Sequence, residues 1–248
     1  MKAFKFSAFS FFSVILFSPV FTSCLNNEDD GDTFTSSYSG PALIQYYGGK
    51  PVVQTVSIQS YPNLLYSSQL DKLTDPAGTP VYVSFLYNDY NQSSTQYITG
   101  SFQGFNWLPE YGISEKDTEK DDYILPISFS ADQQNATDRI ENTWFLFPGI
   151  SDQADQVTDF ELIYLPAETE NNKFTFYLKA KITTSGSGAN QSTTSPIAVN
   201  LNDFIDREGI LKNRDQITYD LKYASSIDEN GNVTYKTLFS DNVLWEKN

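Results

Sequence analysis

The chain has 248 residues, of which 40% are hydrophobic and 15% aromatic, and its formal charge is −15 because 31 acidic residues outnumber 16 basic ones. This charge argues against nucleic acid as a partner, since phosphate binding requires stripes of basic side chains. The absence of histidine excludes a Ser-His-Asp triad, a Cys-His pair and a histidine zinc site. With a single cysteine, no disulfide forms within the chain, so the hydrophobic core alone must hold the fold.

The N-terminus has the pattern of a signal peptide. Lys2 and Lys5 supply a positive start, and an apolar stretch follows over residues 8–21. That stretch is shorter than the roughly 20 residues that a membrane-spanning helix needs. We therefore expect residues 1–23 to be a cleaved signal peptide rather than a membrane span.

The end of this stretch, residues 21–24 (Phe-Thr-Ser-Cys), resembles the bacterial lipobox. The resemblance implies cleavage between Ser23 and Cys24 and lipidation of Cys24, with palmitate among the acyl chains. Two or more buried acyl chains are enough for stable anchoring, so no transmembrane helix is required. The alternative is an ordinary secretory signal followed by a chance cysteine.

An acidic run follows the cysteine, with carboxylates at Glu28, Asp29, Asp30 and Asp32. Like charges extend a chain, so residues 24–40 are expected to form a lipidated, acidic tether. The run also resembles the export signal of Bacteroidota lipoproteins, which implies an outer-membrane protein exposed on the cell surface. The periplasmic leaflet is the alternative location.

Residues 41–120 are predicted to form a small β-domain. The 16 tyrosines and 19 phenylalanines of the chain favour strands over helices. Gly48-Gly49 between two such runs indicates a hairpin. The expected strands cover residues 42–47, 52–59, 81–87 and 95–105, and about five strands in this half are compatible with a small barrel.

A charged stretch at residues 114–122 interrupts the alternation and is interpreted as a domain boundary or a long exposed loop. A calcium site formed by Asp117, Glu119, Asp121 and Asp122 is a weaker alternative. These residues lack the glycine and the ligand spacing of a known calcium loop, and two lysines lie among them. No metal or other cofactor is expected.

Residues 121–248 are predicted to form an antiparallel β-sandwich. Its strands are expected at residues 124–130, 143–147, 158–165, 173–183, 196–201, 217–223, 233–239 and 243–245. A low-complexity loop is expected at 184–195 and a helical turn at 202–211, capped by Asn202. Asn230-Gly231 predicts a tight turn between the last long strands.

The order of these features resembles the NigD-like lipoproteins of Bacteroidota. The resemblance is carried by the lipobox, the acidic tether, residues 77–83 (Ala-Gly-Thr-Pro-Val-Tyr-Val) and the strand-rich C-terminal part. It implies an N-terminal OB-like barrel at 41–120 and a C-terminal β-sandwich at 121–248. That family supplies an expected fold and cellular location but no settled activity.

The sequence is compatible with two functions. The first is a non-catalytic accessory lipoprotein that acts through protein–protein contacts. The second is a glycan-binding module of a polysaccharide-uptake system, with Trp107 and Tyr111 as ligand contacts in an aromatic loop at 104–111. Trp107 could instead fill the end of the barrel, whereas Trp144 and Trp245 are expected in the core. A carboxylate pair serving a glycosidase is expected by chance alone among 31 acids, so no enzyme is predicted.

Overall fold

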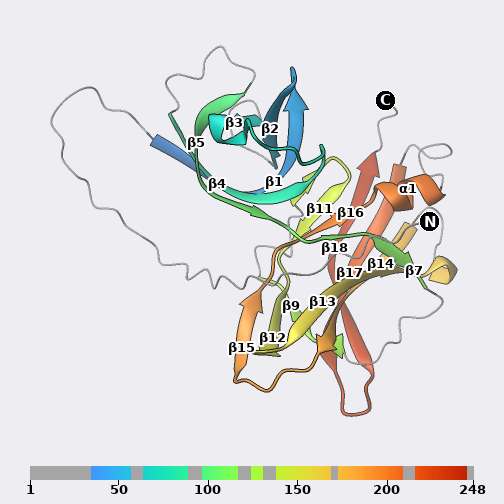
Figure 1. Ribbon diagram of the computed structural model, residues 1–248. Helices are drawn as coiled ribbons and strands as arrows, with labels where there is room; N and C mark the ends of the chain where they lie inside the picture. Colours follow the sequence, from blue (N-terminus) through green and yellow to red (C-terminus); the bar gives the residue numbers. More distant parts are fainter. Residues whose placement is uncertain are drawn as a thin grey trace, which may run out of the picture. The chain divides into compact units, whose positions relative to one another are not determined.

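The computed structural model describes residues 35–56, 64–88, 97–116, 124–130, 138–168, 173–208 and 216–244 (Figure 1). All of these residues belong to one compact unit, Thr33–Asn248. The predicted lipidation site Cys24 and the acidic run after it lie outside the described residues, as does Trp245. Among the helices of the described ranges, none is long and apolar enough to cross a membrane.

The N-terminal part is a closed barrel of five strands in the order β1-β2-β3-β5-β4. These strands are β1 (Thr35–Tyr47), β2 (Lys50–Thr55), β3 (Leu64–Tyr66), β4 (Pro80–Asn88) and β5 (Ile98–Trp107). Antiparallel pairing of β1 with β4 closes one side, and parallel pairing of β3 with β5 closes the other. A five-stranded barrel of this kind is OB-like, as the resemblance implied.

The barrel forms because alternate side chains of its strands point inward. Val81, Val83 and Phe85 of β4 are fully buried in the barrel core. Gly48 and Gly49 join β1 to β2 with φ angles of 58° and 80°, a left-handed geometry that glycine adopts without strain. The predicted hairpin at this position is therefore confirmed.

The C-terminal part consists of three further sheets. The first contains β10 (Asp138–Ile140), β11 (Thr143–Leu146), β16 (Ile197–Asn200) and β6 (Glu110–Tyr111). The second contains β15 (Asn190–Thr194), β12 (Gly149–Gln153) and β9 (Ile127–Ser128). The third contains β18 (Val233–Leu244), β17 (Gln216–Ile227), β14 (Lys173–Thr184), β13 (Val157–Tyr164), β7 (Ile113–Glu115) and β8 (Ile124–Leu125).

Pairing in these sheets is mixed rather than purely antiparallel. Strand β14 runs parallel to β17, β7 runs parallel to β13, and β6 runs parallel to β16. The predicted all-β architecture of barrel plus sandwich holds, but long connections rather than hairpins join these three pairs.

The sandwich core is built around Trp144, which is fully buried. Its ring lies 4.7 Å from that of Tyr219, 5.6 Å from Phe176 and 5.8 Å from Phe239, measured between ring centroids. Aromatic pairs at such distances add to the stabilisation from burial alone. The prediction that Trp144 belongs to the core is confirmed.

Several element boundaries differ from those expected. Residues 35–40, predicted as the end of the tether, belong to β1 because they pair with β4. Pro126 lacks a backbone N–H and separates β8 from β9, which pair with different sheets. The region expected as a loop at 184–195 contains β15, which pairs with β12. Strands β6 and β7 precede residue 120 but pair with strands that follow it, and the division of domains at that residue stays a prediction.

Two local predictions hold. Helix α1 (Asn202–Glu208) occupies the predicted helical turn, but Asn202 is its first residue rather than its cap, because the Leu201 carbonyl accepts the bond from the Ile205 N–H. At the tip between β17 and β18, Asp228 accepts hydrogen bonds from the backbone of Asn230 and Asn232, and Gly231 has a φ of 82°. A hydrogen bond from the side-chain amide of Asn232, together with these backbone bonds, holds the pKa of Asp228 below its usual value.

We expect Gly100→Ala to destabilise the barrel. A Cβ at this position would lie 2.1 Å from the carbonyl oxygen of Leu86 and 2.7 Å from the ring of Phe85, so the two strands would have to move apart. The free energy of unfolding should fall by about 2 kcal/mol. Thermal unfolding by circular dichroism measures this loss. Gly112→Ala is the control, because no heavy atom beyond its two chain neighbours lies within 4 Å of its Cβ position; equal melting temperatures for the two variants would contradict the prediction.

Candidate functional site

A cleft of about 300 Å³ lies on the barrel between β5 and the 3₁₀ turn η1 (Ser68–Leu70). This volume is at the lower end of the range for ligand pockets. Most of its lining side chains are apolar, and two are amides. The lining residues are Gln69, Leu70, Leu73, Phe102, Gln103, Gly104, Phe105 and Trp107.

The turn η1 forms one wall of the cleft because Ser67 fixes its start. The Ser67 hydroxyl accepts a hydrogen bond from the backbone N–H of Gln69, which caps the turn. Leu70 then points into the barrel core, where it is 2% exposed. Leu73 follows, and its N–H donates to the Leu70 carbonyl at 2.7 Å. The wall is thus anchored in the core.

Gln69 connects the two walls. Its Oε1 accepts a hydrogen bond from the backbone N–H of Phe102 at 2.8 Å, and its Nε2 donates to the Phe102 carbonyl at 3.4 Å. A side-chain amide therefore takes the place of a neighbouring strand at this point of β5. The sequence interpretation missed Gln69, because a polar residue in a stretch without clear periodicity gives no signal.

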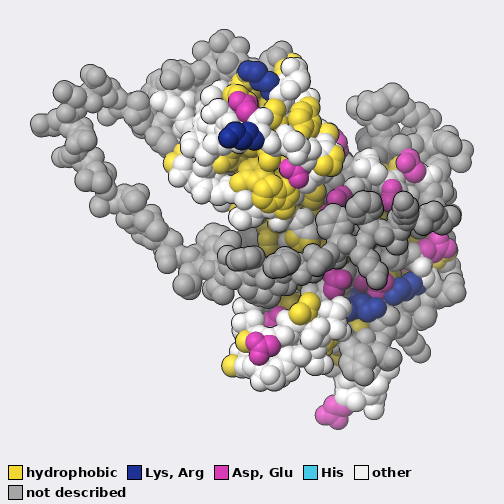
Figure 2. All heavy atoms as spheres, in the orientation of Figure 1, with side chains coloured by type: hydrophobic (Ala, Val, Ile, Leu, Met, Phe, Trp, Pro, Cys, Tyr) yellow, Lys and Arg dark blue, Asp and Glu magenta, His cyan; other side chains and the backbone are white. Residues whose placement is uncertain are grey.

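Trp107 stands at the outer end of the cleft with 56% of its surface exposed. Its indole Nε1 donates to a carboxylate oxygen of Asp75 at 3.2 Å, and its ring meets that of Phe105 edge-on at 5.3 Å. Phe105 in turn packs against Phe102, which belongs to the barrel core. The three rings form a row from the core to solvent. Figure 2 shows hydrophobic side chains gathered on the barrel.

Trp107 therefore belongs to a strand rather than a loop, and it does not fill the end of the barrel. Tyr111, the other predicted contact, lies in β6 and packs against Phe160 of the sandwich core at 6.2 Å. Its burial, together with a hydrogen bond to Asp159 and the charge of that residue, raises its pKa well above the ordinary value. The structure does not bring Tyr111 to the cleft, so only Trp107 of the two lines it.

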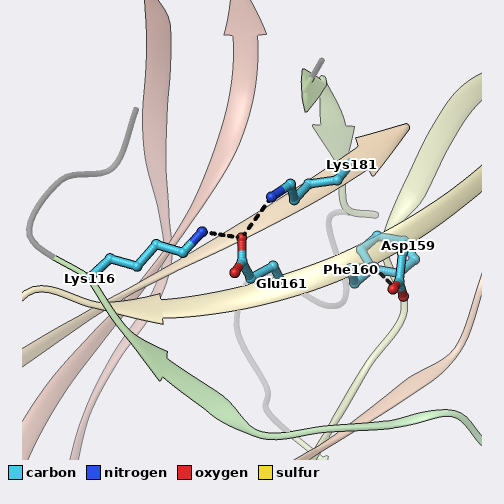
Figure 3. A network of polar contacts seen from close by, with 5 residues as sticks. All are labelled: Lys116, Asp159, Phe160, Glu161 and Lys181. Atoms are coloured by element: carbon cyan, nitrogen blue, oxygen red, sulfur yellow. Dashed lines mark hydrogen bonds and ion pairs between the residues drawn. The ribbon is translucent and has the colours of Figure 1, made fainter. Parts of the chain in front are cut away.

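A separate polar network lies on the large sheet. One carboxylate oxygen of Glu161 accepts hydrogen bonds from Lys116 at 2.8 Å and from Lys181 at 3.4 Å (Figure 3). These partly exposed ion pairs tie the residue after β7 to β13 and β14, and such pairs contribute modestly to stability. We regard this network as structural.

Within the described ranges, no group of three or more histidine, cysteine, aspartate or glutamate residues is arranged to hold a metal ion. The residues of the alternative calcium site, Asp117, Glu119, Asp121 and Asp122, lie outside those ranges.

Comparison with known proteins shows that the chain is similar in fold to several solved structures. No family model matches the chain, and no curated protein matches it. A solved structure of an uncharacterized protein from Parabacteroides merdae has 16% sequence identity and a TM-score of 0.60, over 85% of this chain and all of that one. A candidate lipoprotein from Bacteroides fragilis has 10% identity and a TM-score of 0.54, over 83% of this chain and 97% of that one.

A NigD-like immunity protein from Bacteroides caccae is also similar, with 13% identity and a TM-score of 0.49 over 81% of this chain and 91% of that one. The Parabacteroides and Bacteroides fragilis structures come from Bacteroidota, as the resemblance to lipoproteins of that group implied. At such identities, the similarity to the Parabacteroides merdae and Bacteroides fragilis structures shows a shared fold.

We expect Trp107→Ala to leave the fold nearly as stable as the unmodified chain, because most of the indole is in solvent. The free energy of unfolding should change by less than about 1 kcal/mol. Trp144→Ala should instead cost about 3–5 kcal/mol, since it opens a cavity in a fully buried cluster. Chemical denaturation followed by far-UV circular dichroism compares the two. A loss for Trp107→Ala as large as that for Trp144→Ala would mean that the indole supports the barrel and is not available to a ligand.

Proposed function

We propose that this protein is a non-catalytic binding lipoprotein, anchored in the outer membrane through Cys24 and exposed on the cell surface, that engages a protein partner with its barrel. The observation that carries the proposal is the cleft beside Trp107, where a large aromatic ring that is 56% exposed stands over an apolar depression. Tryptophan is enriched among the residues that dominate protein–protein binding energy.

The cleft is suited to binding because it is formed before a ligand arrives. Leu70 is fixed in the core, Gln69 is bonded to the backbone of Phe102, and the indole of Trp107 is held by Asp75. Pre-organised walls reduce the entropy that binding would otherwise cost. The described lining residues are aromatic, aliphatic, amide or glycine, and these groups contact ligands without acting as acids, bases or nucleophiles at neutral pH.

A glycan is the second candidate ligand. The specific observation in its favour is the combination of an exposed indole with the amides of Gln69 and Gln103, because amides can hydrogen-bond sugar hydroxyls. OB folds bind oligosaccharides as well as oligonucleotides, and the charge of −15 disfavours the latter.

We expect the unmodified protein to incorporate labelled palmitate in cells and to be cut by protease added to intact cells. Cys24→Ala should abolish labelling and release the protein from the membrane fraction, because the acyl chains have no other thiol. Replacing Glu28, Asp29, Asp30 and Asp32 together by alanine should keep the label but protect the protein from external protease. Labelling that survives Cys24→Ala would refute the anchor, and protection of the unmodified protein until the outer membrane is broken would refute surface exposure.

We expect cross-linking in intact cells to join the protein to a partner protein through the cleft. Trp107→Ala should lower the yield of the cross-linked product at least tenfold. Tyr47→Ala is the matched control, because Tyr47 is 41% exposed and does not line the cleft. Quantitative mass spectrometry of the products measures the ratio. Equal yields for both variants would show that the cleft is not the contact surface, and a Trp107-dependent signal confined to a glycan array would favour the second candidate.

A further inference from the structure

Among the described residues, strand β5 has one edge along the cleft that is only partly paired. Strand β3 pairs with β5 at only two positions, Leu65 with Ile98 and Tyr66 with Thr99, and then ends. Beyond these positions, the side-chain amide of Gln69 bonds to the backbone of Phe102. Past Phe102, no strand in the described part of the chain pairs with this edge of β5.

A bulge decides which backbone groups point to the open edge. The register between β4 and β5 joins Phe85 to Phe102 and Ser84 to Gly104, so Gln103 is an extra residue. The backbone of Phe102 points toward η1, because it bonds to Gln69. The extra residue shifts the alternation of backbone hydrogen-bonding direction by one position. The next residues whose backbone groups point away from β4 are therefore Phe105 and Trp107.

The far end of the strand supports this assignment. The backbone N–H of Leu108 donates to the carbonyl of Pro80, so Leu108 points toward β4. The backbone N–H and C=O groups of its neighbour Trp107 must then point away from β4, as must those of Phe105 two residues earlier. Their N–H and C=O groups therefore face the cleft rather than β4, and they make none of the backbone hydrogen bonds found outside the strand pairings of the described residues.

The spacing of these groups fits an extended chain. Residues two apart in a strand are separated by roughly 6.6–6.8 Å, the repeat at which a second strand offers its own N–H and C=O groups. An incoming strand would lie between β5 and the wall of Leu70 and Leu73. Alternate side chains of that strand would then rest on Phe105 and on these leucines.

The charge at the end of the cleft favours a basic side chain. Asp75 places a carboxylate at the N–H edge of the exposed Trp107 ring, and the described cleft lining contains neither lysine nor arginine. A lysine or arginine there would meet both the carboxylate and the face of the indole. The overall charge of −15 would also attract a basic segment over longer distances.

We propose that the cleft binds a basic, extended peptide segment of the partner by strand addition to β5, with hydrogen bonds to the backbone of Phe105 and Trp107. This mode, in which a peptide extends a sheet at its free edge, draws affinity from the main chain and specificity from alternate side chains. The inference rests on the proposed function, because it names the part of the partner that the cleft recognises.

The test selects ligands from a random library of nine-residue peptides displayed on phage, with the full mature chain in detergent as the bait. Peptides that depend on Trp107 should be rich in lysine or arginine. Each backbone nitrogen of the strongest peptide is then methylated in turn, and affinity is measured by tryptophan fluorescence. Methylation at alternate positions should weaken binding at least tenfold, and methylation at the positions between should change it less than twofold, because only every second N–H points to β5.

Two protein variants complete the design. Asp75→Asn should weaken binding of the basic peptide about tenfold, and Tyr47→Ala should leave it unchanged. Uniform tolerance of methylation, or equal loss at adjacent positions, would refute strand addition while leaving a protein contact at the cleft intact. Failure to enrich any Trp107-dependent peptide, with cross-linking in cells still dependent on Trp107, would refute a linear peptide but not the proposed function. Loss of both signals, or a Trp107-dependent glycan instead, would overturn protein recognition itself.

Discussion

The closure of the barrel between β3 and β5 is the constraint on which the candidate site depends. Strand β3 is only three residues long, so it provides two residue pairs to β5, and no other strand of the described residues pairs with the rest of that edge. Buried or half-buried backbone groups need partners, and Gln69 supplies them for Phe102 with both ends of one amide. Immediately beyond this bond the seam opens into the cleft. The same short strand thus makes the barrel incomplete and creates a depression where a ligand can reach β5.

The sandwich fixes the other end of the cleft. Trp107 is followed directly by Leu108, which packs in a cluster with Leu43 of the barrel and with Phe145 and Ala198 of the sandwich. The N–H of Ala198 also donates to the Pro109 carbonyl at 2.9 Å. An exposed indole is therefore attached to a backbone held on both sides of the barrel–sandwich contact. In a chain with one cysteine, packing of this kind has to do what disulfides do in many small extracellular domains.

Periodicity predicts the regular parts of this fold well and its irregular parts poorly. The alternation at 81–87 and 173–183 predicts strands that the structure contains as β4 and β14, and Gly48-Gly49 predicts the turn between β1 and β2. The Ser/Thr-rich region at 184–195 was expected as a loop, but pairing with β12 makes part of it β15, since tertiary contacts override local preference. Tyr111 was expected beside Trp107, and a parallel pairing with β16 takes it to the sandwich core instead.

The aromatic row of the cleft shows why such a site cannot be predicted from the regular alternation of side chains along a strand. Phe102, Phe105 and Trp107 are separated by three and then two residues, so a regular strand would place Phe102 on the opposite face from the other two. The extra residue Gln103 restores a common face, and the ring contacts of 5.5 Å and 5.3 Å follow from it. In a strand, side-chain direction and hydrogen-bonding direction alternate together. The bulge therefore also turns the backbone groups of the residues whose rings line the cleft away from β4, which is the combination that an added strand requires.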